Sequence, residues 1–294
     1  MTTLGIDTSA VDGNKPMDFK ALKAAGARFV YLKRSQGMGL DTCYARDSHD
    51  ARAAGLVVGA YLFPACSTFA AMPKMQVAKF KGAPGDIVTG KDLPPCLDVE
   101  GGGGGWASSG RTKTELVEVI RQFVLELEDA YDCPPVIYTS YNQWYDLGLP
   151  QAPWASRCPL WIKTAYRLEA KQPVDQVAPK QPHVDYDAMH DPRNHERIPP
   201  PWHDAGWWFH QWQGDAVGFP GASKTVDMDH FHTAQKGDSD SRIKMLRRKL
   251  GLKDGVVFDD DLDAAVRQFQ KDSGLLVDGV VGPATFAGIA WRAG

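Results

Sequence analysis

The segment PPCLDVEGGGGGW, residues 94–106, joins a short apolar run to two carboxylates and then to five consecutive glycines. Apolar runs of this kind recur along the chain and alternate with polar segments of helical composition. Such a rhythm is typical of buried strands that alternate with helices. The other runs are LGID (4–7), RFVYLK (28–33), LVVGAYLF (56–63), PPVIYTS (134–140), PLWIKT (159–164) and GWWFHQW (206–212).

The segments between these runs carry helix signals. Gly26 and Gly55 each follow a polar segment and suit a left-handed helix cap. Thr112 and Glu115 form a capping-box pattern, and the segment that contains 115–131 has one apolar face at helical spacing. That face comprises Leu116, Ile120, Phe123, Val124, Leu127 and Tyr131.

Seven or eight strands in this order fit a closed (β/α) barrel, and an open doubly wound sheet would give similar local patterns. We predict an α/β fold with an irregular TIM-like barrel. In both architectures ligands lie beyond the C-terminal ends of the strands. Asp7 ends the first run, Asp98 and Glu100 end the fourth, and Asp227 lies in a further short apolar run. These four carboxylates can therefore converge at one barrel mouth.

Asp98 and Glu100 are two residues apart in an extended segment, so their side chains point to the same face. Two close carboxyl groups resist ionising together, and an apolar lining raises the pKa of the less solvated one further. Glycoside hydrolysis needs this division between a protonated and a charged carboxyl group. A solvated strand end would show the same pattern, but the position after an apolar run favours a catalytic pair. We expect Glu100 to hold the proton near neutral pH.

The glycine run does not resemble a phosphate loop, because it has no lysine and no prompt helix. GDIVTGKD (85–92) comes closer, but Asp92 stands where a magnesium-binding hydroxyl is needed. We interpret the glycines as a turn that, because it has no side chains, lets a bulky polymer approach Glu100.

Aromatic residues in or just after the apolar runs can pack on the flat faces of sugar rings, although each alone would also suit a core. They are Tyr61, Tyr138, Trp161, Tyr166, Trp207, Trp208 and Trp212.

A zinc hydrolase is the rival chemistry, since histidines and aspartates crowd the last third of the chain. No HExxH motif is present, so we interpret these histidines as solvated loop residues and predict no metal and no cofactor. The residues concerned are His183, His190, His195, His203, His210, His230, His232, Asp185, Asp187 and Asp191.

The overall composition excludes several classes of partner. The formal net charge is −3 and the pI is near 6.2, so no basic field favours nucleic acid or anionic lipid. The N-terminus shows no signal-peptide pattern, and no apolar stretch is long enough for a membrane span. Five scattered cysteines indicate free thiols, and Cys96 has no identifiable base that would make it a nucleophile.

The sequence predicts two domains. Residues 1–232 would form the barrel, and residues 242–294 contain three short helix-like segments separated by glycine turns. Residues 233–241, TAQKGDSDS, are interpreted as a polar linker. The aperiodic segment 168–205 is interpreted as a lid or an insertion.

The barrel segment resembles the family 25 glycoside hydrolases, lysozymes that cut the β-1,4 bond between N-acetylmuramic acid and N-acetylglucosamine. The resemblance covers roughly residues 4–232. The motifs that carry it are GIDTS (5–9), FVYLKRSQG (29–37), AAGLVVGAYLF (53–63), PPCLDVE (94–100), PPVIYTS (134–140), PLWIKTAY (159–166), WWFHQWQ (207–213) and GFPGASKTVDMDHF (218–231).

This resemblance implies that Glu100 is the proton donor, and that Asp98 orients the 2-acetamido group of the substrate or stabilises the cationic centre. Asp7 and Asp227 would complete the acidic cluster. A covalent mechanism and an acetamido-assisted one both remain open. The substrate-binding residues expected are Lys33, Tyr61, Tyr138, Trp161, Tyr166, Trp212 and Gln213.

Three positions depart from the pattern of the family. Gln36 stands where many members have glutamate, Leu62 where many have histidine, and Asp12 where glutamine is frequent. Because the acidic quartet is intact, we expect these changes to affect substrate subtype or rate.

The C-terminal segment separately resembles a peptidoglycan-binding module, through IKMLRRKLG (243–251) and AAVRQFQKDSGLLVDGVVGPAT (264–285). We therefore expect a monomeric peptidoglycan hydrolase, made in the cytoplasm without a signal peptide, that acts on the bacterial cell wall. A phage-type endolysin and an exported effector both fit. A catalytically silent wall-binding protein and a metal-dependent amidase or peptidase are the alternative functions.

Overall fold

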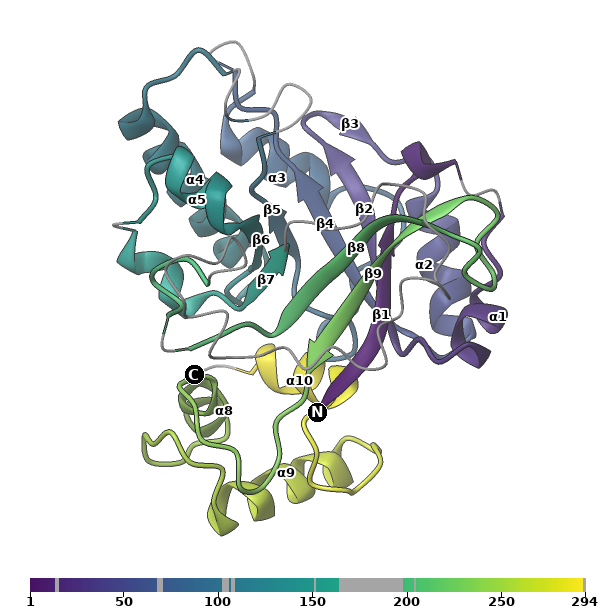
Figure 1. Cartoon of the computed structure of the whole chain (residues 1–294), viewed down its shortest axis with the longest axis vertical. Coiled ribbons are helices and arrows are strands. Elements are labelled where there is room, and N and C mark those ends of the chain that lie inside the picture. Colours follow the sequence, from purple (N-terminus) through teal and green to yellow (C-terminus); the bar gives the residue numbers. More distant parts are fainter. Residues whose placement is uncertain are drawn as a thin grey trace.

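The computed structural model describes residues 1–13, 16–67, 71–101, 106, 109–150, 152–163, 198–203 and 205–292. A barrel forms the upper part of the molecule, and a small helical module lies beneath it (Figure 1). The strands are β1 (Thr2–Thr8), β2 (Phe29–Gln36), β3 (Gly39–Leu40), β4 (Val57–Phe63), β5 (Cys96–Asp98), β6 (Val136–Ser140), β7 (Leu160–Lys163), β8 (Phe209–Val217) and β9 (Thr225–His232).

The helices cover the outside of the barrel and build the module. Two short 3-10 helices, η1 (Ala10–Asp12) and η3 (Pro153–Arg157), accompany them. The α-helices are α1 (Phe19–Ala24), α2 (Tyr44–Ala53), α3 (Pro73–Lys81), α4 (Lys113–Tyr131), α5 (Tyr141–Asp146), α8 (Arg242–Lys249), α9 (Asp260–Asp272) and α10 (Pro283–Ala290).

The sheet closes on itself, because β1 pairs with both β2 and β9. Around the barrel the order is β1, β2, β4, β5, β6, β7, β8 and β9, and β3 only extends the edge of β2. Neighbours around the barrel are parallel except that β9 is antiparallel to both β8 and β1, and the added β3 is antiparallel to β2. Of the two architectures open to the sequence, the closed and irregular barrel is therefore confirmed, and the open sheet is wrong.

Alternation along the strands separates two apolar clusters. On β2, Phe29 and Tyr31 belong to the cluster inside the barrel, whereas Val30 and Leu32 pack outward against the helices. A Cβ atom on Gly5 would collide with the ring of Phe29, and one on Gly59 with the ring of Tyr31. These two glycines therefore make room for the aromatic layers that fill the lower barrel.

The local helix predictions are confirmed. Thr112 and Glu115 form a reciprocal capping box at the start of α4, and Gly26 and Gly55 adopt left-handed backbone conformations with φ of 109° and 80°. The apolar face of α4 is buried at Leu116, Ile120, Phe123, Val124 and Leu127.

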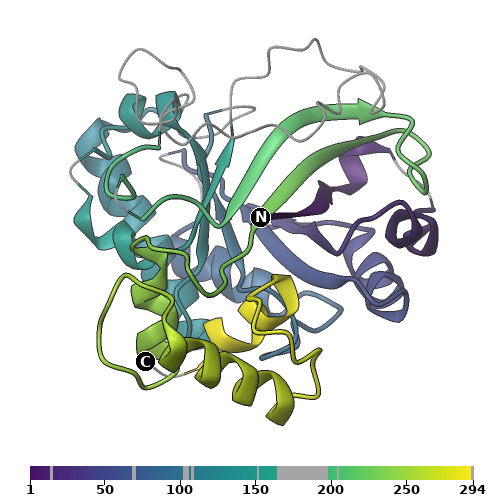
Figure 2. The ribbon, with the colours of Figure 1, turned by 60° about the horizontal axis from the view of Figure 1, so that its bottom comes forward.

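The helical module covers the end of the barrel opposite to the C-terminal ends of the parallel strands (Figures 1 and 2). Phe286 of α10 is fully buried, and its ring centroid lies 4.6 Å from that of Trp208 and 5.3 Å from that of Phe231. The indole Nε1 of Trp291 donates to the carbonyl of Asp92 at 2.7 Å. One apolar cluster therefore runs from the barrel interior into the module.

The segment expected to be a linker is packed where it meets the module. Ala234 is buried and forms a β-bridge with Val281, and Ser239 forms one with Val257. The division into residues 1–232 and 242–294 stays a prediction. Tyr166 lies outside the described residues, and so does most of the predicted insertion at 168–205, which contains His183, His190 and His195.

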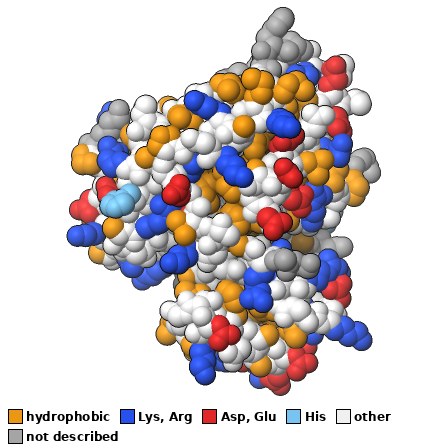
Figure 3. All heavy atoms as spheres, turned by 180° about the vertical axis from the view of Figure 1, so that it is seen from behind, with side chains coloured by type: hydrophobic (Ala, Val, Ile, Leu, Met, Phe, Trp, Pro, Cys, Tyr) orange, Lys and Arg blue, Asp and Glu red, His pale blue; other side chains and the backbone are white. Residues whose placement is uncertain are grey.

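The surface and the cysteines fit the general composition. All five cysteines are buried free thiols. Figure 3 shows acidic and basic side chains interspersed over the face seen there. Within the described ranges, no helix combines the length and the apolar character that crossing a membrane requires.

Candidate active site

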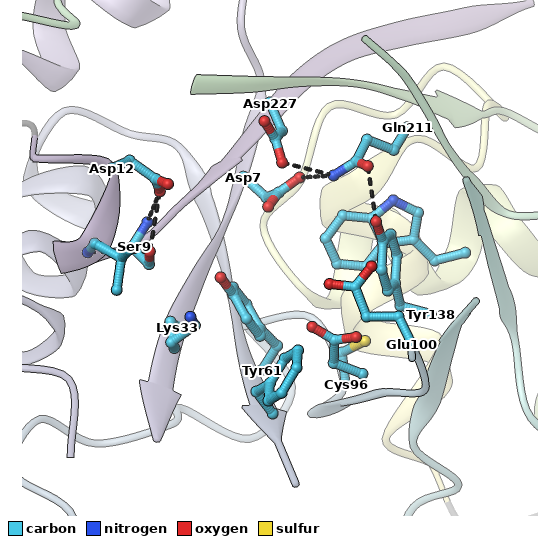
Figure 4. Close-up of a pocket in the computed structure, with 14 residues that line it drawn as sticks. Asp7, Ser9, Asp12, Lys33, Tyr61, Cys96, Glu100, Tyr138, Gln211 and Asp227 are labelled. Atoms are coloured by element: carbon cyan, nitrogen blue, oxygen red, sulfur yellow. Dashed lines mark hydrogen bonds between the residues drawn. The ribbon is translucent and has the colours of Figure 1, made fainter. Parts of the chain in front are cut away.

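A cavity of about 170 Å³, open to solvent, lies at the C-terminal ends of the parallel strands (Figure 4). Because side chains alternate along each strand, every strand that reaches this end presents polar or aromatic groups inward. The cavity is lined by Asp7, Ser9, Val11, Asp12, Lys33, Tyr61, Phe63, Cys96, Asp98, Glu100, Tyr138, Trp161, Gln211 and Asp227.

The four predicted carboxylates all line this cavity. Asp7 is the penultimate residue of β1 and pairs in register with Asp227 of β9. Asp227 lies near the start of β9, and because β9 runs antiparallel to its neighbours, that start is at the mouth. Asp98 ends β5, and Glu100 follows two residues later on the same face.

Asp98 is the more buried member of the predicted catalytic pair. It is 6% exposed, whereas the Glu100 side chain is 23% exposed and its Oε2 lies 3.3 Å from Nζ of Lys163. Burial raises the pKa of Asp98 well above its usual value, the charge of Glu100 raises it further, and Lys33 and Lys163 oppose this. The sequence predicts that Glu100 holds the proton of the pair; this assignment stays a prediction, and burial is greater at Asp98.

Gln211 connects the other two carboxylates. Its Nε2 donates to Asp7 Oδ2 at 2.7 Å and to Asp227 Oδ2 at 3.1 Å, and its Oε1 accepts from the hydroxyl of Tyr138 at 2.7 Å. Burial raises the pKa of Asp7 and of Asp227 well above the usual value. The charge of Asp229 adds for Asp7, and the charge of Asp7 adds for Asp227.

Aromatic rings form part of the wall and the floor. Trp161 stacks on Tyr31 with a centroid distance of 4.7 Å and meets Tyr138 edge-on at 4.8 Å. Tyr61 lies beneath the ammonium group of Lys33, which is 5.7 Å from its ring centroid. An acidic, aromatic-walled cavity of this kind can bind a neutral sugar chain and transfer protons to it.

Residues 6–216 match the sequence family described as glycosyl hydrolases family 25. The chain belongs to this family. Residues 244–288 separately match a family of peptidoglycan binding domains. This family 25 enzyme is therefore a glycoside hydrolase, and together the two domains indicate hydrolysis of peptidoglycan, as the sequence predicted.

Solved structures show the same fold. The lysozyme from Streptomyces coelicolor matches with a TM-score of 0.61 and 22% identity over 78% of this chain and 92% of that one. A family GH25 lysozyme from Aspergillus fumigatus matches with a TM-score of 0.60 and 25% identity over 79% and 94%. A muramidase from Trichobolus zukalii matches with a TM-score of 0.59 and 23% identity over 78% and 93%. Among curated proteins, none matches the chain.

Two predicted substrate-binding residues of the family 25 enzyme lie outside the cavity lining. Trp212 follows the inward-facing Gln211 and stacks on His230, with ring centroids 5.6 Å apart. Gln213 is buried after a register shift between 211 and 213 and pairs with Met228, which belongs to the outer cluster. Strand alternation thus directs Gln211 to the site and Trp212 away from it, and the register shift turns Gln213 away as well.

The sequence did not single out Gln211 or Lys163. The two-residue spacing along each strand could have indicated both, because Gln211 is two residues beyond the apolar Phe209 on β8 and Lys163 is two residues beyond Trp161 on β7. At the departures from the family pattern, Asp12 lines the cavity and accepts from the hydroxyl of Ser9 at 3.0 Å. Leu62 packs in the outer cluster instead.

The interpretation of the histidines as solvated loop residues is wrong for His210, which is buried on β8. Its ring packs at a tilt of 52° against Trp207, with ring centroids 5.1 Å apart, and burial lowers its pKa to about 3. Among the described residues, no group of three or more His, Cys, Asp or Glu side chains is arranged to hold a metal ion. Burial also raises the pKa of the Cys96 thiol, which disfavours the nucleophilic thiolate.

Proposed function

We propose that this family 25 enzyme is an N-acetylmuramidase. It hydrolyses the β-1,4 bond between N-acetylmuramic acid and N-acetylglucosamine, with Glu100 as the general acid and Asp98 as its partner. The observation that carries this proposal is the position of the two carboxyl groups in one cavity, with Glu100 partly exposed and Asp98 buried.

Glu100 is the carboxyl that an incoming glycosidic oxygen can reach. Its side chain is accessible from the cavity, and Lys163 holds one of its oxygens in place at 3.3 Å. A general acid needs this access, because it must approach the leaving oxygen to within hydrogen-bond distance.

Asp98 lies deeper and supplies the second function of the pair. Its Oδ1 has no hydrogen-bond partner among the described residues, so this atom can accept from the amide N–H of the substrate's acetamido group. Burial makes ionisation of Asp98 costly, whereas Lys33 and Lys163 favour it; the ionised form would also stabilise an oxocarbenium-like centre.

The bound sugar would lie against the aromatic wall. Tyr61, Tyr138 and Trp161 line the cavity, and Lys33 sits at its edge. The assignments of Tyr166, Trp212 and Gln213 to substrate binding stay predictions, and so do the monomeric state, the absence of nucleic-acid partners, and release or export to the wall.

Product analysis tests the proposal. Purified peptidoglycan is digested with the wild-type protein, the fragments are reduced with borohydride, and the reduced ends are identified by mass spectrometry. Reduced N-acetylmuramic acid at the new ends is the expected result. Reduced N-acetylglucosamine would indicate a glucosaminidase, and free stem peptides in an EDTA-sensitive reaction would indicate an amidase or peptidase. Binding to the wall without any product would indicate a catalytically silent protein.

A further inference from the structure

Lys33 is the only basic side chain among the described residues that line the cavity. The pairing of β2 with β4 places it there. Lys33 pairs in register with Tyr61, and after a register shift that follows Lys33, Gln36 pairs with Phe63. Tyr61 and Phe63 are two residues apart on β4 and share one face. The shift therefore brings Lys33 and Gln36 to that same face, although residues three apart on a regular strand point to opposite faces.

The ammonium group of Lys33 has aromatic and amide contacts. Its Nζ lies 5.7 Å from the ring centroid of Tyr61 and 5.6 Å from that of Phe63, and it donates to Oε1 of Gln36 at 3.5 Å. Among the described residues, no carboxylate forms an ion pair with Lys33. Aromatic faces attract a cation, but they leave its charge unneutralised. This ammonium group is therefore available to an anion that enters the cavity.

Gln36 keeps that charge available. Its side-chain amide is neutral, whereas a glutamate of the same shape would place a carboxylate at ion-pair distance from Lys33. The other lysine beside the predicted catalytic pair is already engaged, because Nζ of Lys163 lies 3.3 Å from Oε2 of Glu100. The positive charge that the cavity offers to a ligand is thus that of Lys33.

Lys33 is placed to meet a bound sugar chain. In Figure 4, Lys33 and Glu100 lie on opposite sides of the Tyr61 ring. A chain that presents its glycosidic oxygen to Glu100 can therefore extend over Tyr61 toward Lys33. N-acetylmuramic acid carries a lactyl arm on its third carbon, and this arm ends in a carboxyl group that is either free or amide-linked to the stem peptide. N-acetylglucosamine has no such arm.

We propose that Lys33 binds a carboxylate on the lactyl arm of N-acetylmuramic acid, and that Gln36 keeps the charge of Lys33 free for this carboxylate. The proposal rests on the proposed function and gives it a chemical basis for recognising the muramic acid ring. Two sources can supply the carboxylate. It belongs either to the lactyl group itself, in a peptide-free strand, or to the stem peptide that the lactyl group carries.

Lys33 also acts on the site itself. Its charge opposes the rise in pKa that burial causes at Asp98, so it favours the ionised form of Asp98. Loss of this effect would lower kcat for every substrate alike. A contact with a substrate carboxylate is present already in the bound substrate, so its loss raises KM and only for substrates that carry the carboxylate. The dependence of KM on the substrate therefore separates the two effects.

Three soluble substrates of equal chain length test the proposal. The first is an oligosaccharide of alternating N-acetylglucosamine and N-acetylmuramic acid with free lactyl carboxylates. The second has these groups converted to neutral methylamides, and the third carries stem peptides. Lys33→Met keeps an aliphatic stem against the rings of Tyr61 and Phe63 and removes the charge.

We expect Lys33→Met to raise KM by about tenfold to a hundredfold, the usual effect of losing a charge-assisted hydrogen bond. The rise should occur with the free-acid chain if the lactyl group is bound, and with the peptide-bearing chain if the stem peptide is bound. KM for the methylamide chain should not change. An equal rise for all three substrates, or no rise for any, would overturn the proposal.

Gln36→Glu is an independent check, because it leaves Lys33 in place and adds the carboxylate that would pair with it. KM should rise for the same substrate as in Lys33→Met, and an unchanged KM would contradict the role of Gln36. Lys79→Met, at an exposed lysine of α3, is the matched control and should keep the wild-type KM for all three substrates.

The proposed function and the role of Lys33 can fail separately. If the wild type releases no muramic-acid ends, the proposed function fails. Calorimetric titration of the same three oligosaccharides into the wild type, Lys33→Met and Gln36→Glu then decides whether Lys33 binds the carboxylate. If the wild type is an active muramidase and Lys33→Met keeps its KM for both carboxylate-bearing chains, only the role of Lys33 is wrong.

Discussion

Phe286→Ala should destabilise the barrel and the module together. Phe286 belongs to α10, but its ring is fully buried against the lower end of the barrel. The ring centroids of Trp208, Phe231 and Phe209 lie 4.6, 5.3 and 5.8 Å from it. Truncation to alanine leaves a cavity beneath the strands that carry the site.

The expected magnitude follows from this burial. Phe→Ala substitutions at buried sites cost about 3–5 kcal/mol. For a chain of this size, each kcal/mol lowers Tm by roughly 2–4 °C, so Tm should fall by about 10 °C. Leu276→Ala is the control, since Leu276 is 78% exposed and should change stability by no more than about 0.5 kcal/mol.

Differential scanning calorimetry checks this prediction. We expect a single transition in the wild type, shifted as a whole in Phe286→Ala, because one apolar cluster joins the two parts. Two transitions, of which only the smaller moves, would show that the module folds independently. The shared core would then contribute nothing to the stability of the barrel, and the reasoning would be refuted.

Three further outcomes are expected. Asp98→Asn should lower the rate of hydrolysis by about a hundredfold or more and raise Tm. Because burial raises the pKa of Asp98, the stability of the wild type falls as pH rises, so the gain in Tm should be larger at pH 8 than at pH 5. An equal gain at both pH values would contradict this prediction. Gln211→Leu removes the amide donor shared by Asp7 and Asp227 and should lower the free energy of unfolding, measured with urea, by about 1–3 kcal/mol. An unchanged urea midpoint would contradict this prediction. Burial lowers the pKa of His210 to about 3, so the free energy of unfolding should fall as pH drops below about 6.5. Urea unfolding at pH 4.5 and 7 should show a smaller fall for His210→Gln than for the wild type, and an equal fall in both proteins would contradict this prediction.

The strands and the mouth of the barrel were predictable because their signals are local. Each apolar run of the sequence became a strand, and the two-residue spacing of Asp98 and Glu100 placed both on one face, as strand geometry requires. Closure of the barrel was not predictable in the same way. It depends on the pairing of β1 with β9, which joins residues more than two hundred positions apart.

Two predicted binding residues lie outside the cavity lining. Trp212 and Gln213 are expected at the substrate because of their type and motif, but the side of a strand on which a residue lies depends on register. The same reasoning would have found Gln211. Asp98 is more buried than Glu100 in the folded barrel, and this difference depends on strands far apart in the sequence, so the spacing of the pair alone could not reveal which carboxyl is desolvated.

The docking of the module was also beyond sequence reasoning. The apolar spacing in α10 is that of any buried helix, and it does not show whether the partner is the module or the barrel. Phe286 contacts both, through the continuous cluster that includes Leu262 of α9 and Phe209 of β8.

The central claim is that Glu100 donates the proton to the leaving oxygen, and the rate of Glu100→Gln tests it most directly. The number of new muramic-acid ends formed per minute is measured for the wild type, for Glu100→Gln and for Glu118→Gln, an exposed glutamate of α4, after equal Tm values show that all three are folded. We predict a loss of about a hundredfold or more for Glu100→Gln, the usual effect of removing a general acid, and wild-type rates for Glu118→Gln. A Glu100→Gln protein that forms these ends at the wild-type rate would contradict the account.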